Sequence, residues 1–347
     1  MSGYFDPLRG EQQRFSKAAG KFLFLPNKLH NRCCWRFEVF QGGKDMKFDG
    51  IRHSEWADTK FTLHLISQVL GKIKLETAQQ EPQWAHVALT VTPAGFSTGL
   101  LFFGEAAFQV DVNIPNSCIL VNVEGESQSI ALETSKSIKD YFEEIFQALA
   151  SGGIELAVNP KPQEMAYKKH LDEDSSPLTF NRQDALRGLK LFQFALREQL
   201  KFVGPLRCRK MKPALFWGTF DVSLIVLNGI PEPFPEDKVI EKAAFDEQLI
   251  EYGFWLGDEA VDVPTFFVLP YPFLFKELDT SRLRPEQAYY DPARSEFFLD
   301  LESVAAADNA SQTLQDFFRT SFDILSDELG WKDSSRYFQP LDMPKQK

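Results

Sequence analysis

The fold is decided by residues 86–132, which read HVALTVTPAGFSTGLLFFGEAAFQVDVNIPNSCILVNVEGESQSIAL. Short apolar runs alternate in this stretch with turn residues, namely Pro93-Ala94-Gly95, Pro115-Asn116 and Glu124-Gly125. The pattern predicts strands at 86–92, 99–103, 108–114, 118–123 and 129–132. Because the connections are too short to hold crossover helices, neighbouring strands should run antiparallel.

Helical periodicity flanks these strands on both sides. One helix is expected from Ser54, a plausible N-cap, to the stop signal Gly71, and a second from Thr134 or Ser135 to Gly152-Gly153. The same order then recurs, with a helix at 181–203, extended segments at 214–227, 252–256, 265–269 and 296–299, and a helix at 311–329. We therefore expect an α+β fold of largely antiparallel sheets with covering helices, and the recurrence suggests a duplicated helix–strands–helix unit.

The chain divides at a segment rich in proline and polar residues. Pro160-Lys161-Pro162 and the polar run at 172–177 predict a linker over residues 161–180. This boundary separates a first α+β half at 51–160 from a second at 181–347. Residues 1–50 read as an N-terminal extension, with short strands expected at 22–25 and 35–40.

Composition narrows the class of protein without naming a reaction. With 347 residues, 44% of them hydrophobic and 25% charged, the chain can build a large core, to which its 33 phenylalanines contribute. Four cysteines without metal-ligand spacing exclude a disulfide scaffold, and the pI of 5.1 argues against nucleic-acid binding. The N-terminus does not read as a signal peptide, and no apolar run is long enough for a membrane span, so a cytoplasmic protein without membrane contact is expected.

Charge is divided unevenly along the chain. Residues 1–75 hold 13 Lys and Arg against 7 Asp and Glu, whereas the remainder has a net charge of −17. The basic N-terminal part could dock onto the acidic remainder of the same chain or onto an anionic partner.

One predicted helix carries a line of polar residues at i, i+4 spacing, formed by Lys60, His64, Gln68 and Lys72. Two lysines, an imidazole and an amide in a row could hold a carboxylate or phosphate, with His64 as a proton carrier. The alternative is a solvated helix face.

Large aromatic side chains stand beside glycines in 216–221 (FWGTFD) and 253–257 (GFWLG). They could wall a ligand pocket, with Trp84, Trp217 and Trp255 as the walls. Asp221 is the one acid in an apolar strand, and burial would make it an acid–base candidate. His86 could pair with His64 across a site, but two histidines are too few for a zinc site, so no metal ligands are predicted.

Two further motifs are weaker. Gly95-Phe96-Ser97-Thr98-Gly99 matches the G-x-S-x-G pattern of serine hydrolases, but a strand rather than a helix is expected after it. Cys208 lies in the basic run at 207–212, where positive charge would favour a reactive thiolate; an exposed basic loop with an incidental cysteine is the alternative.

Several motifs occur in a fixed order, namely Glu55-Trp56-Ala57-Asp58-Thr59, Thr62-Leu63-His64, Trp84, His86, Val91-Thr92-Pro93, 216–221, Gly253-Phe254-Trp255, Tyr271-Pro272 and Glu296-Phe297. Together they resemble a widespread, mostly bacterial family of uncharacterised proteins, domain of unknown function five-nine-nine-six. The resemblance covers residues 54–331 and implies a soluble protein without an established function. It includes histidine at positions 64 and 86. The family pattern also has histidine where this chain has Ala214, and His-Glu where it has Glu247-Gln248.

These observations lead to one main hypothesis and two rivals. The main hypothesis is a protein that binds a small anionic molecule in an aromatic-lined pocket and acts on it, with His64, His86 and Asp221 as catalytic groups. The ligand would contact Lys60, Gln68, Lys72, Trp84, Trp217 and Trp255. The rivals are a non-catalytic interaction protein that uses residues 1–50 and exposed aromatics, and a metal-dependent enzyme. No cofactor is implied.

Overall fold

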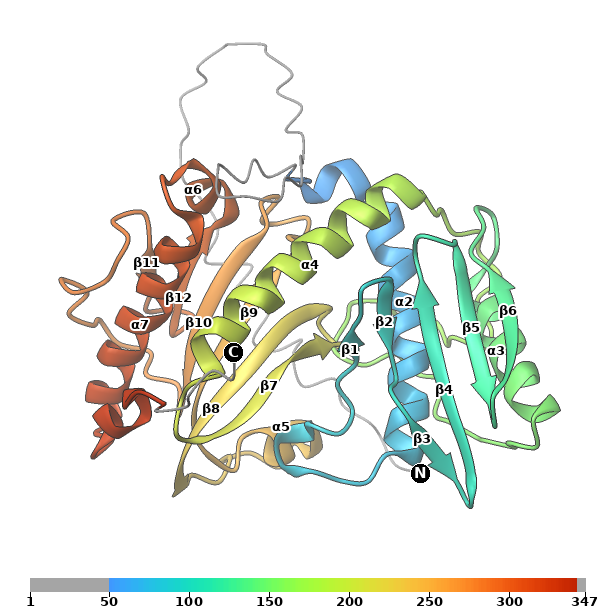
Figure 1. Cartoon of the computed structure of the whole chain (residues 1–347), viewed down its shortest axis with the longest axis horizontal. Helices are drawn as coiled ribbons and strands as arrows, with labels where there is room; N and C mark the ends of the chain where they lie inside the picture. The colour runs from blue at the N-terminus through green and yellow to red at the C-terminus, as the bar shows by residue number, and fades with distance from the viewer. Residues whose placement is uncertain (1–49, 342–347) are drawn as a thin grey trace, which may run out of the picture.

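The computed structural model describes residues 50–341, which form an α+β fold of two antiparallel sheets and their covering helices (Figure 1). The strands expected at 22–25 and 35–40 lie outside the described residues. The predicted order of helix, strands and helix is confirmed in both halves. Each of the two sheets has six strands.

The first sheet has the strand order β1-β2-β4-β5-β6, with β3 paired beside β4. Its strands are β1 (Thr90–Val91), β2 (Gly95–Ser97), β3 (Leu101–Phe103), β4 (Ala106–Asn113), β5 (Cys118–Val123) and β6 (Glu126–Ala131). Every second residue of β4 is buried, as expected for a sheet with one face on the core. Helices α2 (His53–Thr77) and α3 (Ile138–Ser151) accompany this sheet (Figure 1).

The second sheet has the order β11-β12-β10-β9-β8-β7. Its strands are β7 (Arg209–Phe216), β8 (Asp221–Pro231), β9 (Glu247–Trp255), β10 (Thr265–Tyr271), β11 (Tyr289–Asp291) and β12 (Glu296–Asp300). Helix α4 (Arg182–Val203) crosses one face of this sheet, and α7 (Ala310–Glu328) lies beside it on the same face (Figure 1). Two short helices, α5 (Val239–Ala244) and α6 (Leu301–Ala306), complete the half.

The second sheet has two different faces. On the covered face, rings from α4 and α7 pack against rings of the strands, as in the pairs Phe202–Tyr252, Phe194–Phe266 and Tyr252–Phe318. Alternation along the strands turns a second set of side chains to the opposite side. We call that side the open face; it carries Asp221, Ser223, Glu251, Gly253, Trp255, Phe267, Leu269 and Glu296. Phe234 and Phe245 pack on Tyr271 at one end of it.

Three consecutive residues tie the two sheets and α2 together. Leu89 and Leu215 exchange two backbone hydrogen bonds of 2.8 Å, which link the start of the first sheet to β7. The carbonyl of Ala88 accepts a hydrogen bond of 2.7 Å from Lys74 Nζ of α2. The carbonyl of Val87 accepts one of 3.1 Å from Trp217 Nε1.

Helix α2 does not end at Gly71, as the sequence predicted, but continues to Thr77. Glycine is needed at position 71 because the indole ring of Trp217 packs directly against its backbone: a Cβ there would lie 2.2 Å from the ring. The expected cap is also wrong, because the helix begins at His53 with Arg52 at the N-cap position. The second helix begins at Ile138 rather than at 134–135, with Ser137 and Asp140 forming a capping box.

The extended segment predicted at 214–227 is a hairpin of two strands, β7 and β8. The turn at 217–220 contains Phe220 in the left-handed region, with φ of 60°, and a backbone hydrogen bond of 2.8 Å from Phe220 N to Phe216 O. Apolar residues run through the turn, so hydropathy alone gives no break there. The strand expected at 86–92 is similarly reduced to Thr90–Val91, preceded by the 3₁₀ turn η1 (Pro82–Trp84).

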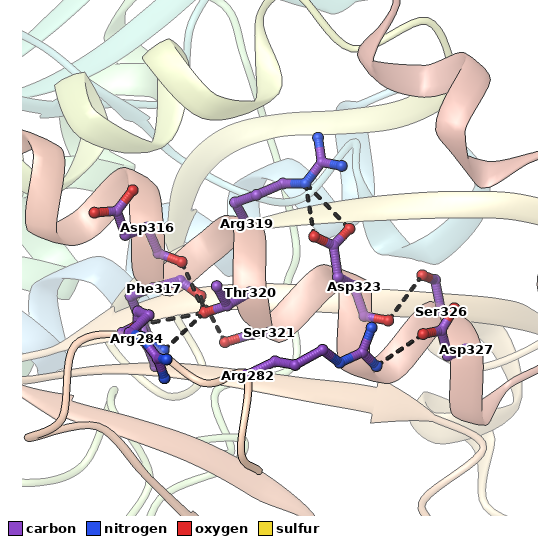
Figure 2. A network of polar contacts seen from close by, with 10 residues as sticks. All are labelled: Arg282, Arg284, Asp316, Phe317, Arg319, Thr320, Ser321, Asp323, Ser326 and Asp327. Atoms are coloured by element: carbon purple, nitrogen blue, oxygen red, sulfur yellow. Dashed lines mark hydrogen bonds and ion pairs between the residues drawn. The ribbon is translucent and has the colours of Figure 1, made fainter. Parts of the chain in front are cut away.

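The outer surface of α7 is held by polar contacts (Figure 2). Arg319 donates to Asp323 one turn along the helix. Arg282, in the loop between β10 and β11, donates to Asp327 at 2.8 Å. These carboxylates therefore have cationic partners on the far side of the second sheet from its open face. Within residues 50–341, no helix has the length and apolar character required to cross a membrane.

Candidate functional site

The polar line of α2 is largely buried, and its side chains form hydrogen bonds with other parts of the chain. Lys60 and Lys72 are buried, Gln68 is completely buried, and His64 is partly buried. Lys60 Nζ donates to the carbonyl of Gly257, and His64 Nε2 lies 2.9 Å from the carbonyl oxygen of Gly218. The imidazole also stacks on Phe220, with 5.1 Å between ring centroids.

Gln68 and Lys72 fasten the 163–164 segment to the helix. Gln68 Nε2 donates to the carbonyls of Gln163 at 2.8 Å and Trp217 at 3.2 Å, and Gln68 Oε1 accepts from the amide of Gln163 at 3.0 Å. Lys72 Nζ donates to Gln163 Oε1 at 2.9 Å. Three of the four predicted residues, His64, Gln68 and Lys72, therefore meet the β7–β8 turn or the segment beside it.

Burial sets the protonation of this line. Desolvation lowers the pKa of His64 to about 4, so its imidazole is neutral at physiological pH and donates its Nε2 proton to Gly218. Desolvation also lowers the pKa of Lys60 and of Lys72 to about 8, although neighbouring carboxylates oppose the shift in both cases. The lysines are thus cations with internal hydrogen-bond partners.

The structure does not bring His86 and Trp84 to His64. Their rings stack on each other with centroids 5.5 Å apart, and Trp84 Nε1 donates to the carbonyl of Ile240 at 2.9 Å. His86 Nδ1 accepts from the amide of Glu81 at 3.1 Å. Lys74, the α2 residue whose charge acts on His86, lies ten residues beyond His64, or about 15 Å along the helix.

Asp221 opens β8 directly after the hairpin turn and is buried, with 5% of its surface exposed. Thr219 and Ser223 each donate a hydroxyl hydrogen bond to one of its carboxylate oxygens. Burial nevertheless raises the pKa of Asp221, because the two hydroxyls offset the loss of hydration only in part. Trp255 stands opposite Asp221 in the register of β8 and β9.

Three glutamates that the sequence analysis did not propose as site residues join Asp221, and Glu251 is the one that interacts with all the others. Glu251 of β9 has its pKa raised to about 8 by desolvation, with Asp221 as the next cause. Desolvation also raises the pKa of Glu164 and of Glu296 to about 7; Asp221 adds to the shift of Glu164, while Arg294 opposes that of Glu296. We call Glu164, Asp221, Glu251 and Glu296 the carboxyl cluster.

The carboxyl cluster adjoins the polar line through Gly218. A Cβ at this position would lie 1.9 Å from Glu164 Oε2, so the carboxyl group lies against the glycine whose carbonyl binds His64. Glu164 is exposed as a whole residue, whereas its carboxyl group is largely surrounded by protein atoms. Glu251 and Glu296 are half-buried. The cluster therefore reaches solvent.

A sequence signal existed for two of these glutamates. Glu251 interrupts the apolar run LIEYGF of β9, and Glu296 directly precedes the apolar residues Phe297 to Leu299 of β12, although each of these strands holds a second acid. Glu164 has no such signal, since it lies in the segment that was predicted to be a linker. Ala214, where the resembled family pattern has histidine, stands opposite Ser223 in the sheet and thus beside the cluster.

The tryptophans differ in their access. Trp217 is buried, with its indole on Gly71 and its Nε1 bonded to Val87, so it serves the core. Trp255 is half-buried on the open face. A small void of about 10 Å³ lies deep between Trp56 and Phe220, too small for a ligand, and a shallow depression of about 470 Å³ lies over β4 and β5, away from the cluster.

The basic run and the hydrolase motif have structural roles. Lys210 Nζ donates to the carbonyls of Val203, Gly204 and Leu206 at the end of α4, and burial raises the pKa of Cys208 to about 11, which disfavours a reactive thiolate. Ser97 is buried in β2 and accepts from the amide of Gly99, with no helix after it.

One group of metal-type ligands occurs within residues 50–341, formed by His170, Asp172 and Glu173, with ligand atoms within 4.8 Å of one another. It lies on the surface of the 161–180 segment and includes none of the predicted site residues.

The fold and the site define a class: an α+β protein with two six-stranded antiparallel sheets and a carboxyl-rich centre on the open face of the second. Residues 48–336 match the family model described as a family of unknown function (DUF5996), and the chain belongs to that family. No curated protein matches the chain. No solved structure matches it either.

Proposed function

We propose that this protein binds a small polar molecule at the carboxyl cluster and exchanges protons with it through Asp221 and the surrounding glutamates. The observation that carries the proposal is the convergence of four carboxyl groups from four separate places in the chain: the 163–164 segment, β8, β9 and β12. Carboxyl groups crowded together in this way destabilise a fold, and such crowding is typical of functional sites.

The backbone beside the cluster supports this proposal. Glu164 and Phe220 both adopt the left-handed region, with φ of 55° and 60°. Each such conformation costs a non-glycine residue about 1 kcal/mol and persists where the surroundings enforce it, often at binding and active sites. Glu164 lies against Gly218 and Asp221 accepts from Thr219, so both carboxyl groups contact the same turn.

The cluster changes the expected ligand. An anionic molecule was expected because of Lys60 and Lys72, but both lysines donate to internal oxygens. Carboxyls with pKa values of about 7 and 8 exist in both protonation states near neutral pH, and they favour a ligand with hydrogen-bond donors. We therefore infer an amine or a polyhydroxylated molecule, with the half-buried ring of Trp255 as an apolar wall.

A thermal-shift screen tests this function. Amines, sugars and polyols, and small carboxylates and phosphates would be compared on wild type, on Glu251→Gln and on the control Glu126→Gln, which replaces an exposed glutamate of β6. We expect stabilisation by a member of the first two panels that persists in Glu126→Gln and is lost in Glu251→Gln. Stabilisation by anions alone, or an identical response of Glu251→Gln, would contradict the assignment.

A further inference from the structure

Ser223 of β8 lies between two carboxyl groups of the carboxyl cluster. Its hydroxyl donates to Asp221, two positions earlier on the same strand, and it also forms a hydrogen bond with Glu251 of β9. The register explains the second contact, because Ser223 stands opposite Gly253 and Glu251 lies two positions from Gly253 on the same face. Ser223 therefore joins the buried Asp221 to the half-buried Glu251.

The number of available protons decides how these three groups can be bonded. A serine hydroxyl donates one proton and its oxygen accepts, whereas an ionised carboxylate only accepts. Ser223 gives its proton to Asp221, so its bond with Glu251 requires a protonated Glu251 that donates to Ser223 Oγ. Asp221 accepts from both Ser223 and Thr219, which favours Asp221 as the ionised partner. The two acids thus hold a proton in common, with a hydroxyl between them.

The hydroxyl is shielded from water. Ser223 is fully buried, and the ring of Phe267 lies on Gly253, where a Cβ would be 1.9 Å from it. Hydrogen bonds in such apolar surroundings are stronger than in water. Asp221 has only 5% of its surface exposed, so Glu251 provides the more direct contact with solvent.

The surroundings of Glu251 favour retention of its proton. Desolvation is the main cause of its raised pKa, and the carboxyl groups of Asp221, Glu296 and Glu164 add to the shift. Further charged groups act on these glutamates: Lys72 of α2 and Glu241 of α5 on Glu164, and Arg294 and Asp291 on Glu296. A proton on Glu251 is therefore available near neutral pH, at the end of the pair that reaches solvent.

We propose that Ser223 relays a proton between Glu251 and Asp221. The O–H bond of Glu251 breaks as its proton moves to Ser223 Oγ, and the proton that Ser223 held moves to Asp221 Oδ2. Asp221 is then a carboxylic acid that donates to Ser223, and Ser223 donates to the Glu251 carboxylate. Glu251 can now accept a proton from a bound ligand or from water.

In this relay, Ser223 is a positioning residue, because it acts through the two acids. The inference deepens the proposed function and rests on it for its purpose, but its test needs no ligand. A ligand screen without hits would leave the relay in place, and a disproved relay would leave a ligand hit in place, so the two proposals fail separately.

NMR titration of carboxyl carbons tests the relay in full-length protein labelled with ¹³C at the side-chain carboxyl groups of Asp and Glu. Asp221→Asn and Glu251→Gln assign the two resonances. When Glu251 ionises near pH 8, it competes for the Ser223 proton, so the Asp221 carbon should shift in the same step. Ser223→Ala removes the hydroxyl between the acids, and the control Thr219→Val removes the other hydroxyl that binds Asp221.

We expect Ser223→Ala to reduce the Asp221 shift at this step at least two-fold and Ser223→Thr, which retains a hydroxyl, to recover it. Thr219→Val should keep the shift, although it also removes one donor from Asp221. An undiminished shift in Ser223→Ala, or an equal loss in Ser223→Ala and Thr219→Val, would overturn the proposal. So would a Glu251 that is ionised at pH 6 in wild type, an outcome that does not depend on the folding of any variant.

Discussion

The polar line of α2 and the carboxyl cluster lie side by side, and both bury groups that prefer water. In the polar line, the ammonium, imidazole and amide groups each meet an oxygen or a backbone amide of another element, as Gln68 does with Gln163. In the carboxyl cluster, the neighbours of Glu251 include three more carboxyl groups. Satisfied polar groups of the first kind fix a structure, whereas crowded acids of the second kind cost stability.

This difference indicates that the carboxyl cluster, rather than His64 in the polar line, is the better candidate for a functional site. His64 is held as a neutral donor to Gly218, and it positions the turn that carries Asp221. We expect proton exchange near neutral pH instead at Glu164, Glu251 and Glu296, whose pKa values burial raises to about 7 or 8. Breaking the first region should therefore unfold the protein, while changing the second should alter its pH dependence.

The largest expected effect comes from Gly71→Leu, which attacks the packing beneath the polar line. A Cβ there would lie 2.2 Å from the Trp217 ring, so the indole must move and its bond to Val87 is lost. We expect a loss of about 3 kcal/mol or more in the free energy of unfolding, measured by urea denaturation. Gly50→Ala, where a Cβ meets nothing within 4 Å, is the control. A Gly71→Leu protein as stable as wild type would refute the packing role.

A smaller effect is expected from Glu251→Gln in the carboxyl cluster. The folded protein retains the Glu251 proton up to about pH 8, whereas the unfolded chain loses it near pH 4.5. The free energy of unfolding should therefore fall as pH rises across this range, and Glu164 and Glu296 should act in the same direction up to about pH 7.

In Glu251→Gln, the fall between pH 5 and pH 8 should be smaller by about 1–3 kcal/mol, measured by urea denaturation at several pH values. Glu126→Gln should retain the wild-type dependence. Parallel curves for wild type and Glu251→Gln would show that this carboxyl group is ionised in the folded protein at neutral pH.

The smallest effect has the opposite sign and belongs to His64. The folded protein resists protonation of His64 down to about pH 4, whereas the unfolded chain binds the proton near pH 6.5. The stability that neutral His64 contributes is complete above pH 6.5 and is lost as pH falls, by about 1 kcal/mol at pH 5.5. NMR titration of the imidazole should show a neutral ring at pH 5.5. A midpoint near pH 6.5 would mean that burial does not control this ring.

The fold was largely predictable because its signals are local. Turn residues bound β5 at Cys118–Val123 as expected, and the periodicity of 182–203 marks α4. The sequence does not show the β7–β8 hairpin as two strands, because its turn is only four residues long and begins and ends with the large apolar residues Trp217 and Phe220. The predicted helix end at Gly71 is wrong because a glycine that ends a helix and one that makes room for an indole ring cannot be distinguished in the sequence.

The site was predicted only in part, for a related reason. Asp221 and the polar line could be identified as an acid in an apolar strand and a helical spacing. Their meeting with Glu164 depends on contacts between residues more than 50 positions apart, which no local pattern encodes. Likewise, nothing in the alternation of Trp84 and His86 shows that η1 carries them to the far end of α2.

Val87, Ala88 and Leu89 have a mechanical consequence. Their three successive carbonyls are bonded by Trp217, Lys74 and Leu215, so one extended tripeptide is pinned to the hairpin turn, the long helix and the edge of the second sheet. Any rotation of one sheet against the other must strain the hydrogen bonds of Val87, Ala88 and Leu89. Since Gly218 of the same turn lies against Glu164 and Thr219 donates to Asp221, a displacement of this turn would change the position of Glu164 relative to Asp221.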